Sequence, residues 1–298
     1  MARVFQSLIA CLVLLLIGLG LWPAPAPVSH VYFEAAPVGR IEVIAHGGGL
    51  GHAPANTRLA LQRARLMGAH VLEADVQQSK DGVLILRHDD TLDRTTNLTG
   101  LIADYDWAEL AAADAGARTE LDGVSFAGQG IAIPRLDAAL AAFPDARWIL
   151  EIKNDTPAAA RRLCEVIVAA KAETRVLVGS FHDRAMRQFR AICPSIATSM
   201  SSGEVRSFVL AARIGVSRLV RTPAVAMQIP VKGGGLDLTH PRLLNAAKTR
   251  GIRVHYWTVN DPDEMDALLR AGADGLITDY VDRGLGQAAA FQAGRDED

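Results

Sequence analysis

Three carboxylates and two histidines between residues 46 and 151 have the types and spacing to hold a cation and move protons. Glu73 and Asp75 lie two residues apart, and Glu151 follows a later apolar run. Side chains alternate between the faces of a strand, so Glu73 and Asp75 point to the same side. Carboxylates packed together repel unless a cation neutralises them, and an all-oxygen set favours Mg²⁺ or Ca²⁺ over zinc. The pattern predicts a divalent metal site.

His46 and His88 each stand at the end of an apolar run. Imidazole exchanges protons near neutral pH, so two of them can serve as general acid and general base. A lone histidine in such a place is more often structural, and each carboxylate alone could cap a helix or pair with Lys153 or Arg87. The joint occurrence of all these groups at strand ends favours the catalytic interpretation.

Short apolar runs alternate with amphipathic helical patterns from about residue 40 onwards, and the helical patterns are clearest over residues 57–67, 158–171, 184–192, 204–214, 241–250 and 262–271. This alternation predicts a parallel sheet wrapped by helices, and polar groups at the strand ends build the site of a parallel β/α barrel. The fold class is therefore α/β, with a single TIM-like (β/α)8 barrel. Strands are expected at residues 42–46, 71–76, 83–88, 148–152, 176–180, 196–200, 254–259 and 275–278, and another could lie within 218–230.

Two segments depart from a regular repeat. Residues 79–82 are too few for a helical crossover between the second and third expected strands, so that pair is joined irregularly. Residues 90–133 are rich in Asp, Gly and Thr and only weakly helical, and long loops inside a compact domain are usually functional. We predict an insertion after the third strand, placed over the mouth of the barrel.

The N-terminus carries an almost uninterrupted apolar run over residues 8–21, followed by a Pro-rich stretch. The run is short for a bilayer span and suits a secretory signal. Residues 1–27 are thus expected to be a signal peptide or membrane anchor plus a Pro-rich linker, 40–285 the barrel and 286–298 a tail. The protein is expected to be exported, periplasmic or extracytoplasmic, either free or tethered to the membrane by residues 8–22.

The composition restricts the kinds of binding partner that can be expected. The 298 residues carry 31 basic and 33 acidic side chains, a formal charge of -2, which gives no support for a nucleic-acid partner. A small-molecule or lysolipid substrate is expected instead. Cys164 and Cys193 are interpreted as two buried free thiols, with a disulfide as the alternative in an oxidising compartment.

A series of short motifs occurs in order from about residue 41 to 282. They are Ile44-Ala45-His46-Gly47-Gly48, Pro54-Ala55-Asn56-Thr57, Glu73-Ala74-Asp75-Val76, Lys80-Asp81-Gly82, His88-Asp89 with Leu92 and Arg94-Thr95-Thr96, Glu151-Ile152-Lys153, Trp257-Thr258-Val259-Asn260 and Gly275-Leu276-Ile277-Thr278-Asp279. Together they resemble the motifs of the glycerophosphodiester phosphodiesterase family.

The resemblance implies a β/α barrel with an insertion after the third strand, a divalent metal, and hydrolysis of glycerophosphodiesters to glycerol 3-phosphate and an alcohol. The implied roles are metal ligation by Glu73, Asp75 and Glu151, proton transfer by His46 and His88, phosphate contact by Lys153, and lining of the substrate channel by Trp257. Filling the barrel core is the alternative for Trp257, and Asp279 is expected to be a turn or cap residue.

Two positions depart from the family pattern. Gly47 stands where the family has an arginine that grips the phosphate, and Ala55 replaces the glutamate of its Pro-Glu-Asn-Thr motif. Lysine cannot copy the planar bidentate contact of arginine. His52 and Arg58 are the nearest substitutes, and the glycines from Gly47 to Gly49 could instead offer backbone N–H groups. Arg87 should face away from the site, because it is next to His88 on a strand.

Two other functions compete with metal-dependent hydrolysis of glycerophosphodiesters. One is a lysophospholipase D-like activity, in which the insertion accepts an acyl chain. The other is a barrel that binds phosphodiesters without turnover, suggested by the missing arginine and glutamate.

Overall fold

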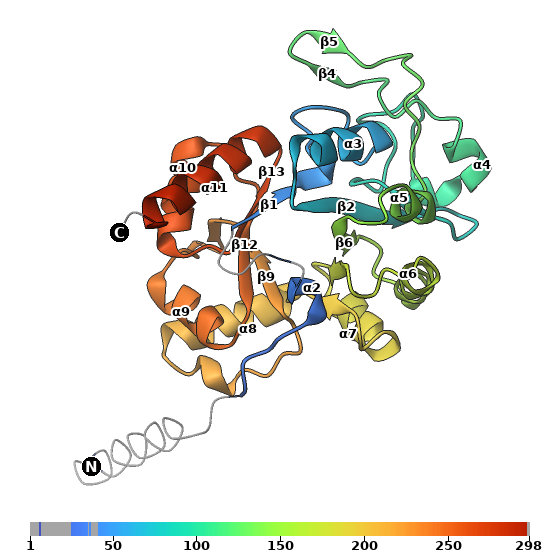
Figure 1. The fold of residues 1–298 in the computed structure, drawn as a ribbon. Coiled ribbons are helices and arrows are strands. Elements are labelled where there is room, and N and C mark those ends of the chain that lie inside the picture. The colour runs from blue at the N-terminus through green and yellow to red at the C-terminus, as the bar shows by residue number, and fades with distance from the viewer. Residues whose placement is uncertain (1–5, 7–24, 35, 37–40, 297–298) are drawn as a thin grey trace.

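The computed structural model describes residue 6, residues 25–34, residue 36 and residues 41–296, and they form a barrel of parallel strands wrapped by helices (Figure 1). The sheet order is β8-β7-β6-β2-β1-β13-β12-β9, and a parallel bridge between Ser199 and Ala226 joins its two ends. The barrel strands are β1 (Glu42–Ala45), β2 (Val71–Gln78), β6 (Arg147–Ile152), β7 (Val176–Gly179), β8 (Ala197–Thr198), β9 (Ala226–Ile229), β12 (Arg253–Tyr256) and β13 (Gly275–Thr278). The predicted TIM-like barrel is confirmed.

Two strand assignments differ from the sequence prediction. The third expected strand is β3 (Leu84–Leu86), which pairs antiparallel with β2 and lies outside the barrel path. The barrel position left open is taken by β9, within the segment 218–230 that was only a possible strand. The short connection after β2 explains the first difference, because it permits only an antiparallel hairpin.

Helices follow the strands and cover the outside of the barrel (Figure 1). Six match the predicted helical patterns, whereas α5 and α11 were not predicted, and α11 extends into the segment expected to be a tail. The helices are α3 (Arg58–Met67), α5 (Leu136–Ala142), α6 (Pro157–Ala169), α7 (Asp183–Ile192), α8 (Ser202–Arg213), α9 (Pro241–Thr249), α10 (Pro262–Ala271) and α11 (Val281–Asp296). Thr57, Thr156 and Asp261 cap three of them by accepting backbone hydrogen bonds.

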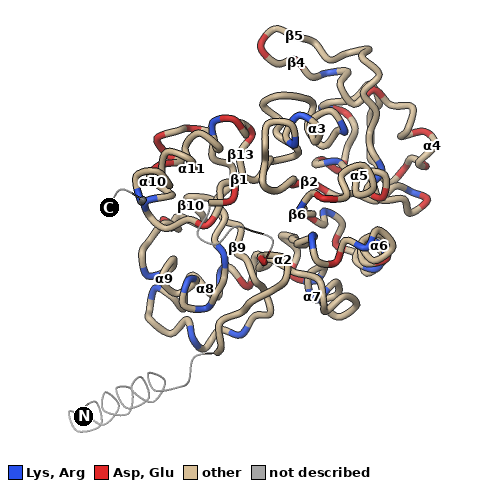
Figure 2. Tube along the Cα trace, viewed as in Figure 1, with Lys and Arg blue, Asp and Glu red and all other residues tan. Residues whose placement is uncertain are grey.

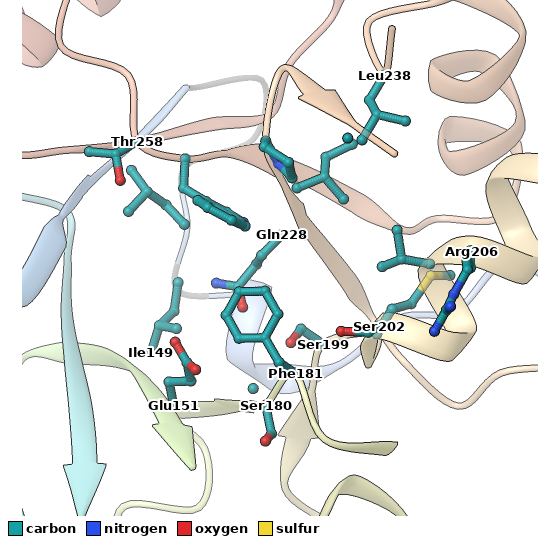
Figure 3. Close-up of a pocket in the computed structure, with 18 of the residues that line it drawn as sticks. Ile149, Glu151, Ser180, Phe181, Ser199, Ser202, Arg206, Gln228, Leu238 and Thr258 are labelled. Carbon is teal, nitrogen blue, oxygen red and sulfur yellow. The ribbon is translucent and has the colours of Figure 1, made fainter. Parts of the chain in front are cut away.

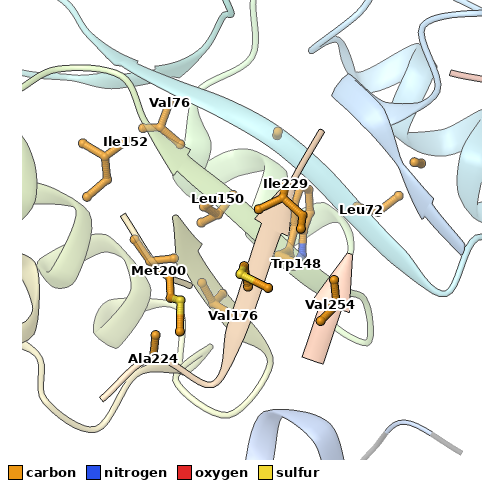
Figure 4. Close-up of a cluster of buried hydrophobic side chains, with 14 of the residues drawn as sticks. Leu72, Val76, Trp148, Leu150, Ile152, Val176, Met200, Ala224, Ile229 and Val254 are labelled. Atoms are coloured by element: carbon orange, nitrogen blue, oxygen red, sulfur yellow. The ribbon is translucent and has the colours of Figure 1, made fainter. Parts of the chain in front are cut away.

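Alternation along the strands divides the buried side chains into two sets. Outward residues such as Leu72, Trp148 and Val254 pack under the helices (Figure 4). Inward residues form a separate layer across the middle of the barrel: Ile44, Val71, Ile149, Leu177, Ala197, Ala226 and Ile277. Two residues further along the strands, the same inward face carries polar side chains. The apolar layer therefore lies directly beneath these polar side chains and closes the bottom of any site that they form.

The N-terminal end of the barrel is closed by α2 (Val31–Glu34). Tyr32 is fully buried, and the Arg147 guanidinium lies 4.2 Å from its ring centre. Arg147 pairs with Glu42 at the start of β1, and His255 also contacts Glu42. Burial would raise the pKa of Glu42, but His255 and Arg147 outweigh it and lower that pKa to about 2. The segment after the Pro-rich stretch thus belongs to the fold.

The cysteine prediction is wrong in its default form. Cys164 in α6 and Cys193 after α7 form a disulfide, with their Cα atoms 6.0 Å apart. The two helices are consecutive in the repeat and pack side by side, which brings the cysteines within bonding range.

The insertion between β3 and α5 has its own small core. It contains η2 (Ile102–Asp104), α4 (Trp107–Leu110) and a hairpin of β4 (Glu120–Leu121) and β5 (Val124–Ser125) that projects from the barrel in Figure 1. Its buried residues are Leu92, Ile102, Leu110, Ala113 and Ala115, with Ile85 and Ile133 on either side.

The predicted signal or anchor at residues 8–22 lies outside the described residues. Among the residues that are described, no helix is long and apolar enough to cross a membrane. Figure 2 shows basic and acidic residues interspersed over the helices in this view.

Candidate active site

A cavity of about 740 Å³ opens at the carboxyl ends of the barrel strands. The metal and proton-transfer candidates all line it, together with Lys153 and Trp257. Figure 3 shows Glu151 at one end of the cavity, Phe181 and Gln228 in the middle, and Arg206 and Leu238 at the far end. The polar ends of separate strands therefore meet in one pocket, as the sequence predicts.

The three carboxylates converge. Glu73, Asp75 and Glu151 each offer an oxygen within 4.8 Å of the others. Ligands on opposite sides of a cation lie about 4 Å apart for Mg²⁺ and about 5 Å apart for Ca²⁺, twice the metal–oxygen distance. The donor set and its spacing thus fit either ion with small adjustments.

Neighbouring groups hold these carboxylates in place. The Gly47 N–H donates to Glu73 at 2.6 Å, and the Asn56 amide donates to Asp75 at 2.8 Å while its oxygen accepts from the Asp75 N–H at 2.9 Å. The Lys153 ammonium lies 2.8 Å from Asp75 and 2.9 Å from Glu151. One ammonium against three carboxylates leaves an excess of negative charge.

That excess appears in the pKa values. Burial and the neighbouring Asp75 raise the pKa of Glu73 to about 8, against a lowering by His46. Burial also raises the pKa of Glu151, although Lys153 counteracts it. A doubly charged cation would remove this repulsion, which is the physical reason to expect one here.

His46 is held by a carboxylate of its own. Its Nδ1 lies 2.7 Å from Asp279, which in turn accepts from the Asn260 amide at 2.7 Å. Burial lowers the pKa of His46, but the hydrogen bond to Asp279 and the charge of Glu73 prevail and raise it to about 9. Asp279, expected to be a turn or cap residue, instead orients the imidazole.

His88 is held in the same way, by the carboxylate of Asp89. Its Nδ1 lies 2.8 Å from Asp89, and Arg94 holds Asp89 through two hydrogen bonds of 2.6 and 3.0 Å. The side chain is half-exposed, at 52%. Each imidazole is therefore fixed at Nδ1, which leaves Nε2 to exchange a proton.

The groups considered as replacements for the family arginine lie elsewhere. Arg58 is exposed at the start of α3 and does not line the cavity. His52 pairs with Asp282, and Arg87 is buried and donates to Thr95, on the side away from the cavity. The Gly47 N–H is used by Glu73. Among the described residues, Lys153 and Arg206 are the lysine and arginine side chains that line the cavity.

The two departures from the family pattern are neighbours in space. A Cβ added at Gly47 would lie 3.2 Å from the Ala55 Cβ. The two positions at which this chain departs from the family pattern therefore lie side by side.

Aromatic side chains form part of the cavity wall. Phe181 and Trp257 both line the cavity and meet edge to face, with ring centres 5.6 Å apart. Trp257 lines the cavity and also packs against the inward apolar layer, so its position is compatible with both alternatives.

Sequence reasoning missed the residues that orient the others. Asn56 bonds to the candidate ligand Asp75, and Asp89 and Asp279 bond to the two histidines. Asn260 holds Asp279 in turn. The alternation of side chains along a strand could have predicted that Asp279 points inward, because it stands two residues after the inward-facing Ile277 and directly follows the end of β13. The hydrogen bonds that Asn56 and Asn260 make each join residues 19 positions apart in the chain, and no local sequence pattern reveals such a contact.

Comparison with known proteins agrees with this geometry. Residues 46–283 match the model of the glycerophosphoryl diester phosphodiesterase family. A glycerophosphodiester phosphodiesterase of Caldanaerobacter subterraneus is 32% identical over 80% of this chain and 93% of its own, and one of Bacillus altitudinis is 30% identical over 82% and 96%. An Oleispira antarctica phosphodiesterase, solved in complex with sn-glycerol-3-phosphate, superposes with a TM-score of 0.67 at 25% identity, covering 88% of this chain and all of that one.

This protein is a hydrolase with a TIM-like barrel, in which an acidic cluster and two histidines lie at the carboxyl ends of the strands. The chain belongs to the glycerophosphoryl diester phosphodiesterase family, and it is an enzyme of the phosphoric diester hydrolase class.

Proposed function

We propose that this protein hydrolyses glycerophosphodiesters to glycerol 3-phosphate and an alcohol with the help of a divalent cation, Mg²⁺ or Ca²⁺. Glu73, Asp75 and Glu151 would hold the ion. When bound, the ion would polarise a phosphate oxygen and lower the pKa of a coordinated hydroxyl or water. The observation that carries the proposal is the carboxylate cluster flanked by two imidazoles, each fixed by its own carboxylate.

The protein's own groups supply the rest of the chemistry. The Lys153 ammonium would neutralise a phosphate oxygen, taking over part of the role of the absent arginine. Nε2 of one histidine would accept the proton of the nucleophile, and Nε2 of the other would donate one to the leaving alkoxide. Asp279 and Asp89 would keep both rings in the required orientation and tautomer.

The test is an assay of the purified full chain on glycerophosphocholine with Mg²⁺, with Ca²⁺, or with a chelator. We expect release of glycerol 3-phosphate with at least one ion, a loss of at least about a hundredfold on chelation, and recovery on adding the ion back. Binding of either ion by calorimetry without hydrolysis of any glycerophosphodiester would support the non-catalytic barrel instead.

We also propose export to an oxidising compartment. The apolar run at residues 8–21 and the bond between Cys164 and Cys193 both favour it, because disulfides persist outside the cytosol. Cell fractionation should recover the protein outside the cytoplasm, and a cytosolic protein with free thiols would refute this proposal.

The catalytic groups do not by themselves select the substrate. Simple glycerophosphodiesters and lysophospholipids present the same glycerol phosphate centre, so they differ only in what the remaining cavity must accept.

A further inference from the structure

The catalytic cavity continues into a second region, which we call the apolar arm. It is lined by Met200, Val205, Val209, Leu210, Leu236 and Leu238. These residues belong to the same cavity as His88 and Glu151, so a ligand can occupy both regions at once. In Figure 3, Leu238 and Arg206 lie at the end away from Glu151.

One wall of the arm is a face of α8. Ser202, Val205, Arg206, Val209 and Leu210 all line the cavity, and their spacing of three, four, seven and eight residues places them on one side of the helix. Arg206 is exposed, so its charged end can stay in water while its stem lies along the wall.

The facing wall comes from the connection after β9. Ile229 ends that strand and Pro230 follows it, and β10 (Lys232–Gly233) and β11 (Leu236–Asp237) then form a small hairpin. Gly234 and Gly235, both with positive φ, make its turn. The hairpin places Leu236 opposite the helix, and Leu238 follows directly.

Met200, Val209 and Leu238 in the arm are buried, whereas its rim leaves apolar side chains open to solvent. Leu210 is 56% exposed and Phe181, on the path from the carboxylates, is 50% exposed. Apolar surface in a concave pocket costs free energy until something apolar covers it. A small polar head group gains no binding free energy from these apolar walls, whereas a hydrocarbon chain does, because it covers them and excludes water.

We propose that the apolar arm holds the single acyl chain of a lysophospholipid while the glycerol phosphate lies at the carboxylates. This rests on the proposed hydrolytic function and names the substrate class for the same site. The insertion at 90–133 does not supply this arm, because none of its residues lines the cavity. The chain-binding wall is instead α8 and the hairpin after β9.

The test compares glycerophosphocholine with hexanoyl, decanoyl and palmitoyl lysophosphatidylcholine, each used as monomers with the ion present. Since each buried methylene strengthens binding about fourfold, KM should fall by at least about tenfold between the hexanoyl and decanoyl substrates. In Leu210→Gln, kcat/KM for the decanoyl substrate should fall about tenfold, with glycerophosphocholine turnover within about twofold of the parent protein.

The matched control is Ile214→Gln, which changes a residue 75% exposed, directly after the end of α8 and outside the cavity. It should leave every substrate unaffected. Calorimetry with monomeric dodecylphosphocholine gives a second readout, and its binding should weaken about tenfold in Leu210→Gln only.

The outcomes separate the two proposals. Hydrolysis of glycerophosphocholine without any dependence on chain length, or an equal effect of both substitutions, would overturn the chain site and leave the hydrolytic function standing. Chain binding that depends on Leu210, with no hydrolysis of any substrate, would support the arm and refute the proposed function.

Discussion

Glu73→Gln is expected to lower kcat/KM for glycerophosphocholine by at least about a thousandfold, which is ~4 kcal/mol of transition-state stabilisation. The substitution keeps the shape of the side chain and an acceptor for the Gly47 N–H, but removes the charge at the centre of the acidic cluster. Steady-state kinetics over a range of Mg²⁺ and Ca²⁺ concentrations would measure the loss. Glu165→Gln, an exposed change on α6, is the control and should have no effect.

The same substitution should stabilise the metal-free protein. Burial and Asp75 raise the pKa of Glu73 to about 8 from an ordinary 4.5, so its favourable contribution is complete below the unfolded pKa and is lost as the pH rises through about 8. Glutamine does not ionise, so without metal the Tm of the variant should exceed that of the parent more at about pH 9 than at about pH 5.

Added Mg²⁺ or Ca²⁺ should raise the Tm of the parent and leave that of Glu73→Gln nearly unchanged. A metal-dependent rise of the same size in both proteins would show that Glu73 is not a ligand.

His46→Ala and His88→Ala are each expected to lower turnover of glycerophosphocholine by about a hundredfold to ten-thousandfold, because each removes one proton transfer. A substrate with a p-nitrophenol leaving group needs no protonation of the departing oxygen. Activity on it should therefore recover in the variant that lacks the general acid and stay low in the variant that lacks the general base. This assigns the two roles.

His240→Asn is the control for the histidine variants. His240 caps α9 through its side chain, and asparagine can make the same bond. Near-parental activity in either active-site variant, with circular dichroism showing a folded protein, would refute the two-histidine mechanism.

Local pattern was enough to predict the outline of the site. Glu73 and Asp75 share a face because a strand alternates, and the same rule correctly turned Arg87 away from the cavity. The apolar runs predicted seven of the barrel strands within a few residues, since a strand buried on both faces is recognisable from its own composition.

Which strands pair with one another was harder to predict from the sequence. Residues 83–88 read as a barrel strand, yet β3 pairs antiparallel with β2, and the short β8 and β9 complete the barrel through one bridge. Strand pairing depends on which segments meet in space, and composition reports only that a strand exists.

By itself, the sequence determined the kinds of residue available and the face of the strand or helix on which each one lies, because both follow from the local geometry of the backbone. Only the tertiary structure decided that Asp279 orients His46, that Cys164 bonds to Cys193, and that α8 and a glycine hairpin extend the catalytic cavity with apolar walls. Those features join segments that are far apart in the chain, and the residues involved come into contact only when the barrel has closed.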